Sequence, residues 1–245
     1  MNIFIGELIG TMLLVLFGDG VVANVVLQKT KGQNGGWIVI TAGWGFGVAI
    51  AVYVAGWASG GHLNPAVTVG MAVVDKLGWD QVPLYLVAQL LGGFLGAVLV
   101  WAAYLPHWSK TDNQVAKLSV FSTVPEVRHT FGNLICEVIG TAVLLGGVLG
   151  IANTHNGITG GIGPLLVGIL VFSIGLSLGG PTGYAINPAR DLAPRIAHAL
   201  LPIPGEGSSD GRYAWIPVVG PLLGGIVGAL MYNTLFAGLT PLAGQ

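Results

Sequence analysis

Six long apolar segments constrain the fold of this chain more than any other feature of its sequence. They cover residues 3–27, 37–57, 82–104, 131–153, 162–178 and 214–239. A bilayer core about 30 Å thick is crossed by roughly 20 apolar residues in a helix. Four of the six segments contain no Asp, Glu, Lys or Arg. Barrel strands would instead alternate in hydrophobicity over about ten residues. The sequence therefore predicts an all-α membrane protein with six transmembrane helices.

The composition excludes several classes of function. Of the 245 residues only 8% are charged, whereas soluble domains carry roughly 25%. The net charge is −1 and no basic run is present, so nucleic acid is not an expected partner. The single cysteine, Cys136, supports neither a disulfide framework nor a metal site. No catalytic constellation or phosphate-binding motif stands out, so we expect no enzyme activity, no cofactor and no metal.

A short stretch occurs twice between the long segments, as SGGHLNPAVT (59–68) and as GGPTGYAINPARD (179–191). The pieces that follow, 65–74 and 188–200, would reach only about 15–20 Å as helices, which is half a bilayer. Non-helical backbone at membrane depth is tolerated only where protein or a water-filled cavity satisfies it. The sequence therefore predicts two re-entrant half-helices that line a cavity.

The two halves of the chain resemble each other. GELIGTMLL (6–14) parallels CEVIGTAVL (136–144), and LLGGFLGA (90–97) parallels LLGGIVGA (222–229). Each half contains three spans and one half-helix, and because three is odd the second half must enter the membrane inverted. We expect one channel domain over 1–245, with repeats at 1–105 and 131–245 joined by a connecting loop at 106–130. The two half-helices then meet N-terminus to N-terminus.

Both copies of the stretch contain Asn-Pro-Ala. Proline fits the first position of a helix, and asparagine is a strong N-cap whose side-chain oxygen can accept the free helix N–H groups. The amide hydrogens of the asparagines then point at whatever passes, on the positive end of each half-helix. Such a site binds the oxygen of water or an alcohol, repels cations and interrupts a proton-conducting chain. The residues are Asn64, Pro65, Ala66, Asn187, Pro188 and Ala189.

Glu7 and Glu137 occupy matching places in the two repeats and are the deepest acids of the spans. We expect each carboxylate to accept N–H groups from a re-entrant loop, although an intramembrane acid can also relay protons. His62 is expected to support the first loop through a hydrogen bond. The loop carbonyls would guide a hydroxylated solute in single file; they belong to Gly60, Gly61, His62, Leu63, Gly183, Tyr184, Ala185 and Ile186.

Three further charged positions surround the second half-helix. Arg190 at its start cannot be deprotonated, so in the lumen it would donate to solute oxygens and exclude cations. The alternative is an arginine that extends to the membrane interface. Asp191 and Arg195 have the i, i+4 spacing of an ion pair. Asp19 lies about 18 Å along its helix from Glu7, and we expect it to reach the outer interface.

These residues and motifs resemble the aquaporin family, also called major intrinsic proteins, along essentially the whole chain. NPARD (187–191), followed by Arg195, is similar to the glycerol-facilitator branch. The resemblance implies a homotetramer with one pore per subunit in the plasma membrane, cytoplasmic termini, passive flux and no cofactor. Most lysines and arginines would then lie outside, contrary to the positive-inside rule. We give the resemblance the greater weight.

The resemblance also implies an outer selectivity filter at Trp44, Gly175, Tyr184 and Arg190. Water-selective relatives have histidine in the place of Gly175, so glycine is expected to widen the filter. Trp44 and Tyr184 would form an apolar corner opposite the donors of Arg190, which suits a polyol. The sequence thus predicts a passive channel for glycerol and similar small uncharged solutes that also conducts water.

Two alternatives remain open at this point. A water-selective channel shares the same motifs but would require a narrower filter. An ion-coupled secondary transporter also uses inverted repeats and broken helices, and it would need a titrating acid such as Glu7 or Glu137. The hydroxyl of Tyr184, where relatives often carry phenylalanine, leaves open the ranking of glycerol, water, dihydroxyacetone and lactic acid.

Overall fold

The computed structural model describes residues 1–159, 161–236 and 239, and this part of the chain contains helices and no strand. The main helices follow the predicted segments closely. They are α1 (Asn2–Val26), α2 (Trp37–Ser59), α3 (Pro65–Val73), α4 (Val82–Ala103), α7 (Thr130–Ile151), α8 (Gly163–Leu178), α9 (Pro188–Leu200) and α10 (Ile216–Phe236). The expected sixth span runs past α10 into 237–238, which lie outside the described residues.

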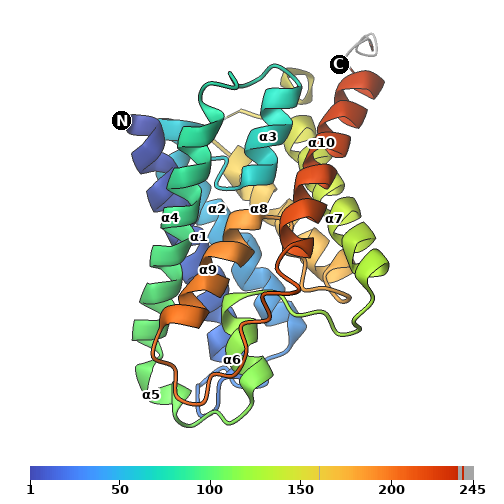
Figure 1. Ribbon diagram of the computed structural model, residues 1–245. Coiled ribbons are helices and arrows are strands. Elements are labelled where there is room, and N and C mark those ends of the chain that lie inside the picture. Colours follow the sequence, from blue (N-terminus) through green and yellow to red (C-terminus); the bar gives the residue numbers. More distant parts are fainter. Residues whose placement is uncertain (160, 237–238, 240–245) are drawn as a thin grey trace.

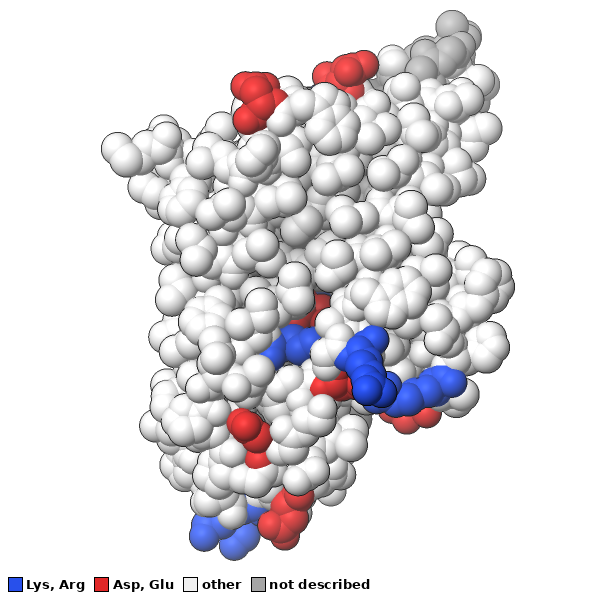
Figure 2. Space-filling model, viewed as in Figure 1, with Lys and Arg blue, Asp and Glu red and all other residues white. Residues whose placement is uncertain are grey.

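Length and hydropathy confirm the membrane architecture. Within the described residues five helices, α1, α2, α4, α7 and α10, are long and apolar enough to cross a bilayer. The remaining predicted span, 162–178, is α8, which is apolar but has only 16 residues. Figure 2 shows an uncharged band between acidic groups at the upper end of the molecule and the charged groups spread over its lower half.

Helices of the two repeats pack in the same pattern. Helix α1 packs against α2 and α4, and α7 packs against α8 and α10. Each half-helix packs on a long helix of the opposite repeat: α3 packs on α10, and α9 packs on α4. In Figure 1, α3 occupies the upper part of the bundle and α9 the lower part, while the start of α1 and the end of α10 lie at the same end.

Glycine residues of α4 and α10 allow the half-helices of the opposite repeat to approach closely. A Cβ added at Gly93 of α4 would lie 2.9 Å from the Ala189 carbonyl oxygen, and one at Gly225 of α10 would lie 2.6 Å from that of Ala66. Both oxygens belong to the first turn of a half-helix. Close backbone approach through small residues is the usual way in which helices associate in lipid.

The segment expected to be only a connecting loop, 106–130, is more ordered than predicted. It contains the end of α5 (Leu105–Trp108) and α6 (Gln114–Phe121); a further short helix, η1 (Thr154–Asn156), follows α7. The rings of Trp108 and Phe121 stack 5.5 Å apart, and both side chains are buried. This packing makes the segment a folded cap over the end of the bundle where α9 terminates (Figure 1).

Candidate functional site: two half-helices and a lined pore

Asparagine caps both half-helices in the same way. The Asn64 side-chain oxygen accepts a hydrogen bond from the Ala66 amide at 2.8 Å. The Asn187 oxygen accepts from the amides of Ala189 at 3.0 Å and Arg190 at 3.3 Å. Proline occupies the first turn in each case, where its missing N–H has no helical partner to lose.

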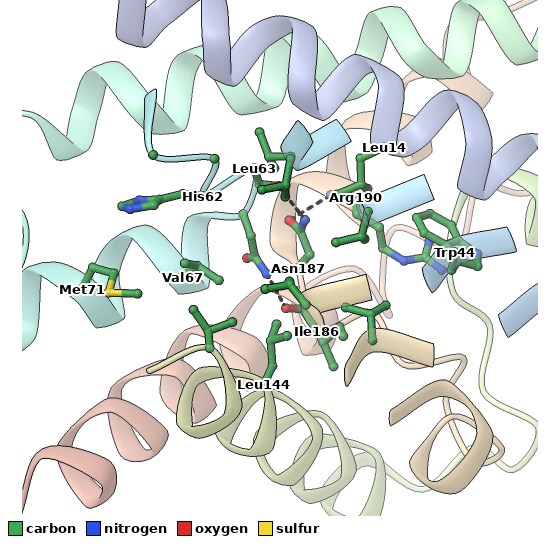
Figure 3. Close-up of a pocket in the computed structure, with 18 of the residues that line it drawn as sticks. Leu14, Trp44, His62, Leu63, Val67, Met71, Leu144, Ile186, Asn187 and Arg190 are labelled. Atoms are coloured by element: carbon green, nitrogen blue, oxygen red, sulfur yellow. Dashed lines mark hydrogen bonds between the residues drawn. The ribbon is translucent and has the colours of Figure 1, made fainter. Parts of the chain in front are cut away.

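Each asparagine also reaches across to the opposite loop. Asn64 Nδ2 donates to the Ile186 carbonyl at 2.8 Å, and Asn187 Nδ2 donates to the Leu63 carbonyl at 2.8 Å (Figure 3). The starts of α3 and α9 therefore meet. We expected the amide donors to be turned to the lumen, but one hydrogen of each amide binds the other loop. An amide carries two, so one remains for a solute.

The carbonyls that receive these bonds belong to strained residues. Leu63 has φ of 51° and Ile186 has φ of 43°, a left-handed conformation that is unfavourable for bulky side chains. Such strain costs of order 1–3 kcal/mol per residue and persists only where the surroundings hold it. Here a carboxylate holds the amide of each residue and an asparagine holds its carbonyl.

Glu7 and Glu137 lie behind the loops and bind their backbone. Glu7 accepts from the amides of His62 at 3.0 Å and Leu63 at 2.7 Å. It also accepts from Ser59 Oγ at 2.6 Å and Gln89 Nε2 at 2.7 Å. Its carboxylate therefore takes four hydrogen bonds and joins α2, the first loop and α4.

Glu137 performs the matching contacts in the second repeat. It accepts from the amides of Ala185 at 3.0 Å and Ile186 at 2.9 Å, and from Thr182 Oγ1 at 2.7 Å. Both glutamates are buried. His62 lies in the first loop with Nδ1 3.2 Å from Thr68 Oγ1.

A cavity of about 230 Å³ runs past the junction of the two half-helices. Its polar wall comes from the loops and the start of α9, and its apolar wall comes from helices α1, α2, α3, α7 and α8. In Figure 3 the labelled side chains run from Met71 and His62 at one end to Trp44 and Arg190 at the other. The polar wall comprises Gly60, Gly61, His62, Leu63, Asn64, Tyr184, Ala185, Ile186, Asn187 and Arg190.

A second cavity of about 240 Å³ lies beyond that end, and Gly183 is among its lining residues. Trp44, Tyr184 and Arg190 line both cavities, so they form the wall between them. The Arg190 guanidinium carbon lies 4.0 Å from the centre of the Trp44 ring, and Arg190 is only 7% exposed. This geometry places a fixed cation at the constriction rather than at the membrane interface.

Gly175 lines neither cavity within the described part of the chain. A Cβ at Gly175 would lie 2.8 Å from Tyr184 Cζ and 2.8 Å from Thr41 Cγ2. Its carbonyl accepts from Trp37 Nε1 at 2.9 Å, and the Trp37 ring meets Tyr184 edge-on at 5.7 Å. The space left by this glycine is thus occupied by the tyrosine ring, which itself forms the constriction.

Asp191 and Arg195 form a buried ion pair behind the constriction. Asp191 accepts from Arg195 Nε at 2.9 Å and from the amide and hydroxyl of Thr123 at 2.7 and 2.6 Å. Arg195 also donates to the Thr123 carbonyl at 2.8 Å. The pair therefore attaches α9 to the end of the cap segment that contains α6.

Comparison with known proteins agrees with this architecture. The family model described as "Major intrinsic protein" matches residues 1–232. The chain belongs to this family. It is 60% identical over 236 residues to a probable glycerol uptake facilitator protein of Thermotoga maritima, covering 96% of this chain and all of that protein. It is 57% identical over 238 residues to the glycerol uptake facilitator protein of Bacillus subtilis, covering 97% and 86%.

A solved structure is also similar to this major intrinsic protein. The aquaglyceroporin from Plasmodium falciparum matches with a TM-score of 0.86 and 32% identity, over 96% of each chain. The similarity extends over both repeats and both half-helices, so it is a likeness of the whole bundle rather than of one motif.

Sequence reasoning missed three residues that hold the site of this major intrinsic protein. Gln89 contacts Glu7, Thr123 holds Asp191, and Trp37 supports both Gly175 and Tyr184. Gln89 could have been noticed as the one amide in an otherwise apolar span. Thr123 lies in a polar connection that gives no such signal.

Proposed function

We propose that this major intrinsic protein is a passive channel for glycerol and similar small uncharged solutes, that it also conducts water, and that it excludes ions and protons. The observation that carries the proposal is the two-sided cavity at the junction of the half-helices, with loop carbonyls and amides on one wall and apolar side chains on the other. The glycerol uptake facilitators to which the chain is similar support the choice of solute.

The two walls match the chemistry of a polyol. Glycerol carries hydroxyl groups along one edge and C–H groups along the other. At the constriction the guanidinium of Arg190 can donate to hydroxyl oxygens while the rings of Trp44 and Tyr184 contact carbon. A solute that satisfies both walls loses little on leaving water, because its polar groups keep partners while its carbon skeleton is desolvated.

Exclusion of cations follows from fixed positive potential. The two half-helices point their N-termini at the same place, where asparagine amides add further donors. Arg190 contributes a full charge at the constriction. Because these groups only donate hydrogen bonds, water at this point is oriented and a continuous proton-conducting chain is interrupted.

An ion-coupled mechanism is less well supported by the geometry. It would require a titrating acid that faces the solute. Glu7 and Glu137 are instead occupied by four and three hydrogen bonds from the loops and do not line the cavity. Both carboxylates therefore suit a supporting role.

The family resemblance supports a proposal for the assembly. We propose a homotetramer in the plasma membrane with cytoplasmic termini. Exposed apolar side chains on the outer surface of α2, such as Ile38, Phe46 and Ile50, suit contact with lipid or with neighbouring subunits. Cross-linking of the protein in native membranes would give a four-subunit ladder if the proposal is correct.

Stopped-flow light scattering on proteoliposomes tests the transport proposal. A glycerol gradient should give fast re-swelling with low activation energy and no charge movement. An impermeant osmolyte applied separately measures water flux. Fast shrinkage without glycerol re-swelling would identify a water-selective channel instead, and accumulation of glycerol against its gradient would identify a coupled transporter.

A further inference from the structure

The hydroxyl group of Tyr184 and the carboxyl group of Asp19 are both buried without a hydrogen-bond partner among the described residues. Asp19 is covered, contrary to our expectation that it reaches the outer interface, because α1 continues beyond it to Val26 and other elements pack on this part of the helix. Asp19 lines neither of the two cavities in the described part of the chain, whereas Tyr184 lines both. The burial of the Tyr184 hydroxyl is therefore the one that bears on the pore.

A slot between α2 and the end of α8 holds the Tyr184 ring. A Cβ at Gly175 would lie 3.0 Å from the Tyr184 hydroxyl oxygen, and one at Gly179 would lie 2.5 Å from Tyr184 Cδ1. Thr41 closes the end of the slot, since its Cγ2 lies 2.8 Å from the same Cβ position at Gly175 and its hydroxyl donates to the backbone of its own helix. The hydroxyl end of the tyrosine thus lies between two helices, and the lumen meets only carbon atoms of its ring.

Trp37 at the start of α2 closes a further side of the slot. Its indole nitrogen donates to the Gly175 carbonyl at 2.9 Å, and its ring meets the Tyr184 ring edge-on at 5.7 Å. Its Cζ2 lies 2.8 Å from the position of a Cβ at Gly179. Trp37 lines the outer cavity but not the cavity at the junction of the half-helices. It therefore contacts Tyr184 from outside the constriction.

The backbone of Tyr184 shows why its ring needs this support. Its φ of 38° lies in the left-handed region, which is unfavourable for a large side chain and persists only where the surroundings hold it. Glu137 holds the next amide, that of Ala185. The side chain of Tyr184 itself has no hydrogen-bond partner in the described part of the chain. The position of the ring therefore depends on packing in the slot.

We propose that Trp37 is a positioning residue that sets the width of the constriction by keeping the Tyr184 ring in this slot. The inference rests on the proposed filter role of Trp44, Tyr184 and Arg190. It also narrows the class of solute. An unbranched polyol such as glycerol can lay its C–H edge along the ring. A branched polyol such as pentaerythritol is wider and carries hydroxymethyl groups on every side of its central carbon, so at least one hydroxyl would face carbon and lose its water without a new partner.

Swelling of proteoliposomes in separate gradients of pentaerythritol and glycerol tests this proposal. We expect Trp37→Leu to raise the ratio of pentaerythritol to glycerol permeability about tenfold, because the ring loses both its edge contact and the hydrogen bond that fixes the indole, and can swing toward the outer cavity. Trp37→Phe keeps an aromatic edge but lacks the N–H group, and it should raise the ratio about threefold.

Trp57 provides the matched control. It lies on the same helix, and its indole nitrogen also donates to a backbone carbonyl, that of Val54 at 3.0 Å. It is 84% exposed and lines neither of the two pore cavities in the described structure. Trp57→Leu should leave the permeability ratio unchanged.

Two further readouts separate positioning from structural support. In a Tyr184→Leu background, Trp37→Leu should add no further change in the ratio, because the effects of residues that act through one another are not additive. Sucrose, which is larger than both polyols, should stay excluded by every variant. Its exclusion distinguishes a wider constriction from a damaged vesicle.

Several results would overturn the proposal. An unchanged ratio in Trp37→Leu, including an equal fall of both permeabilities, would reduce Trp37 to structural support. A rise of the same size in Trp57→Leu or in the Tyr184→Leu background would show that the effect does not pass through the tyrosine ring, and entry of sucrose would show a leak. If Trp37→Leu does not fold, Trp37→Phe decides by the same ratio, and failure of both while Trp57→Leu folds would make Trp37 a structural residue. Absence of glycerol flux in the unaltered protein would instead reject the proposed function.

Discussion

The two re-entrant loops share their support and differ in what they add to it. In both, a buried glutamate holds the loop amides, a strained residue precedes asparagine, and that asparagine binds the opposite loop. After the shared Asn-Pro-Ala, the first half-helix continues with Val67 and Thr68, and the second continues with Arg190 and Asp191. One half-helix is uncharged and the other carries a cation and a buried ion pair.

This difference distinguishes the contacts that hold the two loops in place from the residues that we propose select the solute. The shared contacts hold the junction of the half-helices inside the helix bundle, where either repeat alone would leave polar backbone without partners. The two charged residues after Asn-Pro-Ala, Arg190 and Asp191, occur only in the second repeat, beside the cap that contains α6. The repeat is thus symmetric where it must support the backbone and asymmetric where we propose that it selects solutes.

The largest expected effect concerns Asp191 and its counterpart Thr68. Asp191→Ala leaves Arg195 and Thr123 buried without their acceptor, and breaking a buried ion pair costs about 3–5 kcal/mol. Thr68→Ala removes a hydroxyl that donates to the Asn64 carbonyl and accepts from Gln89 Nε2, which costs about 1–3 kcal/mol. Thermal unfolding in detergent measures both. Equal losses would mean that the ion pair gives the second half-helix no special stability.

Replacement of the two glutamates should give a smaller difference in the loss of stability. Each oxygen of Glu7 takes two donors, whereas one oxygen of Glu137 takes a single donor. Glu7→Gln therefore leaves two donors facing an amide NH2 group, but Glu137→Gln can leave only one. Each unpaired buried donor costs about 1–3 kcal/mol. We expect the larger drop in unfolding temperature for Glu7→Gln, and the reverse order would contradict this account of the loops.

Arg190→Val gives the second half-helix the residue that the first has in the same place. Removing the cation should raise proton and sodium leak roughly tenfold, since each 1.36 kcal/mol of barrier is worth a factor of ten. Gel filtration of the purified variant and its recovery in the vesicle fraction report correct folding and insertion independently of glycerol flux, to which Arg190 itself contributes. If the leak stays at the level of the unaltered channel, the half-helix termini and asparagines alone exclude ions, and the asymmetry has another purpose.

Gly175→Ala should have the smallest effect. The added methyl group would push the Tyr184 ring toward the lumen. We expect glycerol permeability to fall about threefold to tenfold, which corresponds to a rise of less than about 1.4 kcal/mol in the free-energy barrier to glycerol passage. Water permeability should fall less. Adding Tyr184→Leu removes the ring that the methyl group displaces and should restore glycerol flux. A loss that persists in the double variant would show that the glycine matters for some other contact.

Much of the architecture could be predicted from the sequence because the membrane allows few solutions. The apolar runs and the paired Asn-Pro-Ala stretches indicated the all-α fold, and the structure and the family comparison confirm it. Side-chain direction could not be predicted in the same way. Asp19 was misplaced because position along a helix does not reveal which elements cover it, and the order of 106–130 depends on long-range packing of Trp108 and Phe121.

The crossed asparagine bonds also bear on how the molecule is made. Asn64 and its acceptor are separated by 122 positions in the chain, and Asn187 and its acceptor by 124. Synthesis proceeds from the N-terminus, so the first loop enters the membrane long before the carbonyl that its asparagine requires exists. Contacts between such distant parts form late. We therefore expect the junction of the two half-helices to close only after the second loop has been synthesised, late in the biogenesis of the protein.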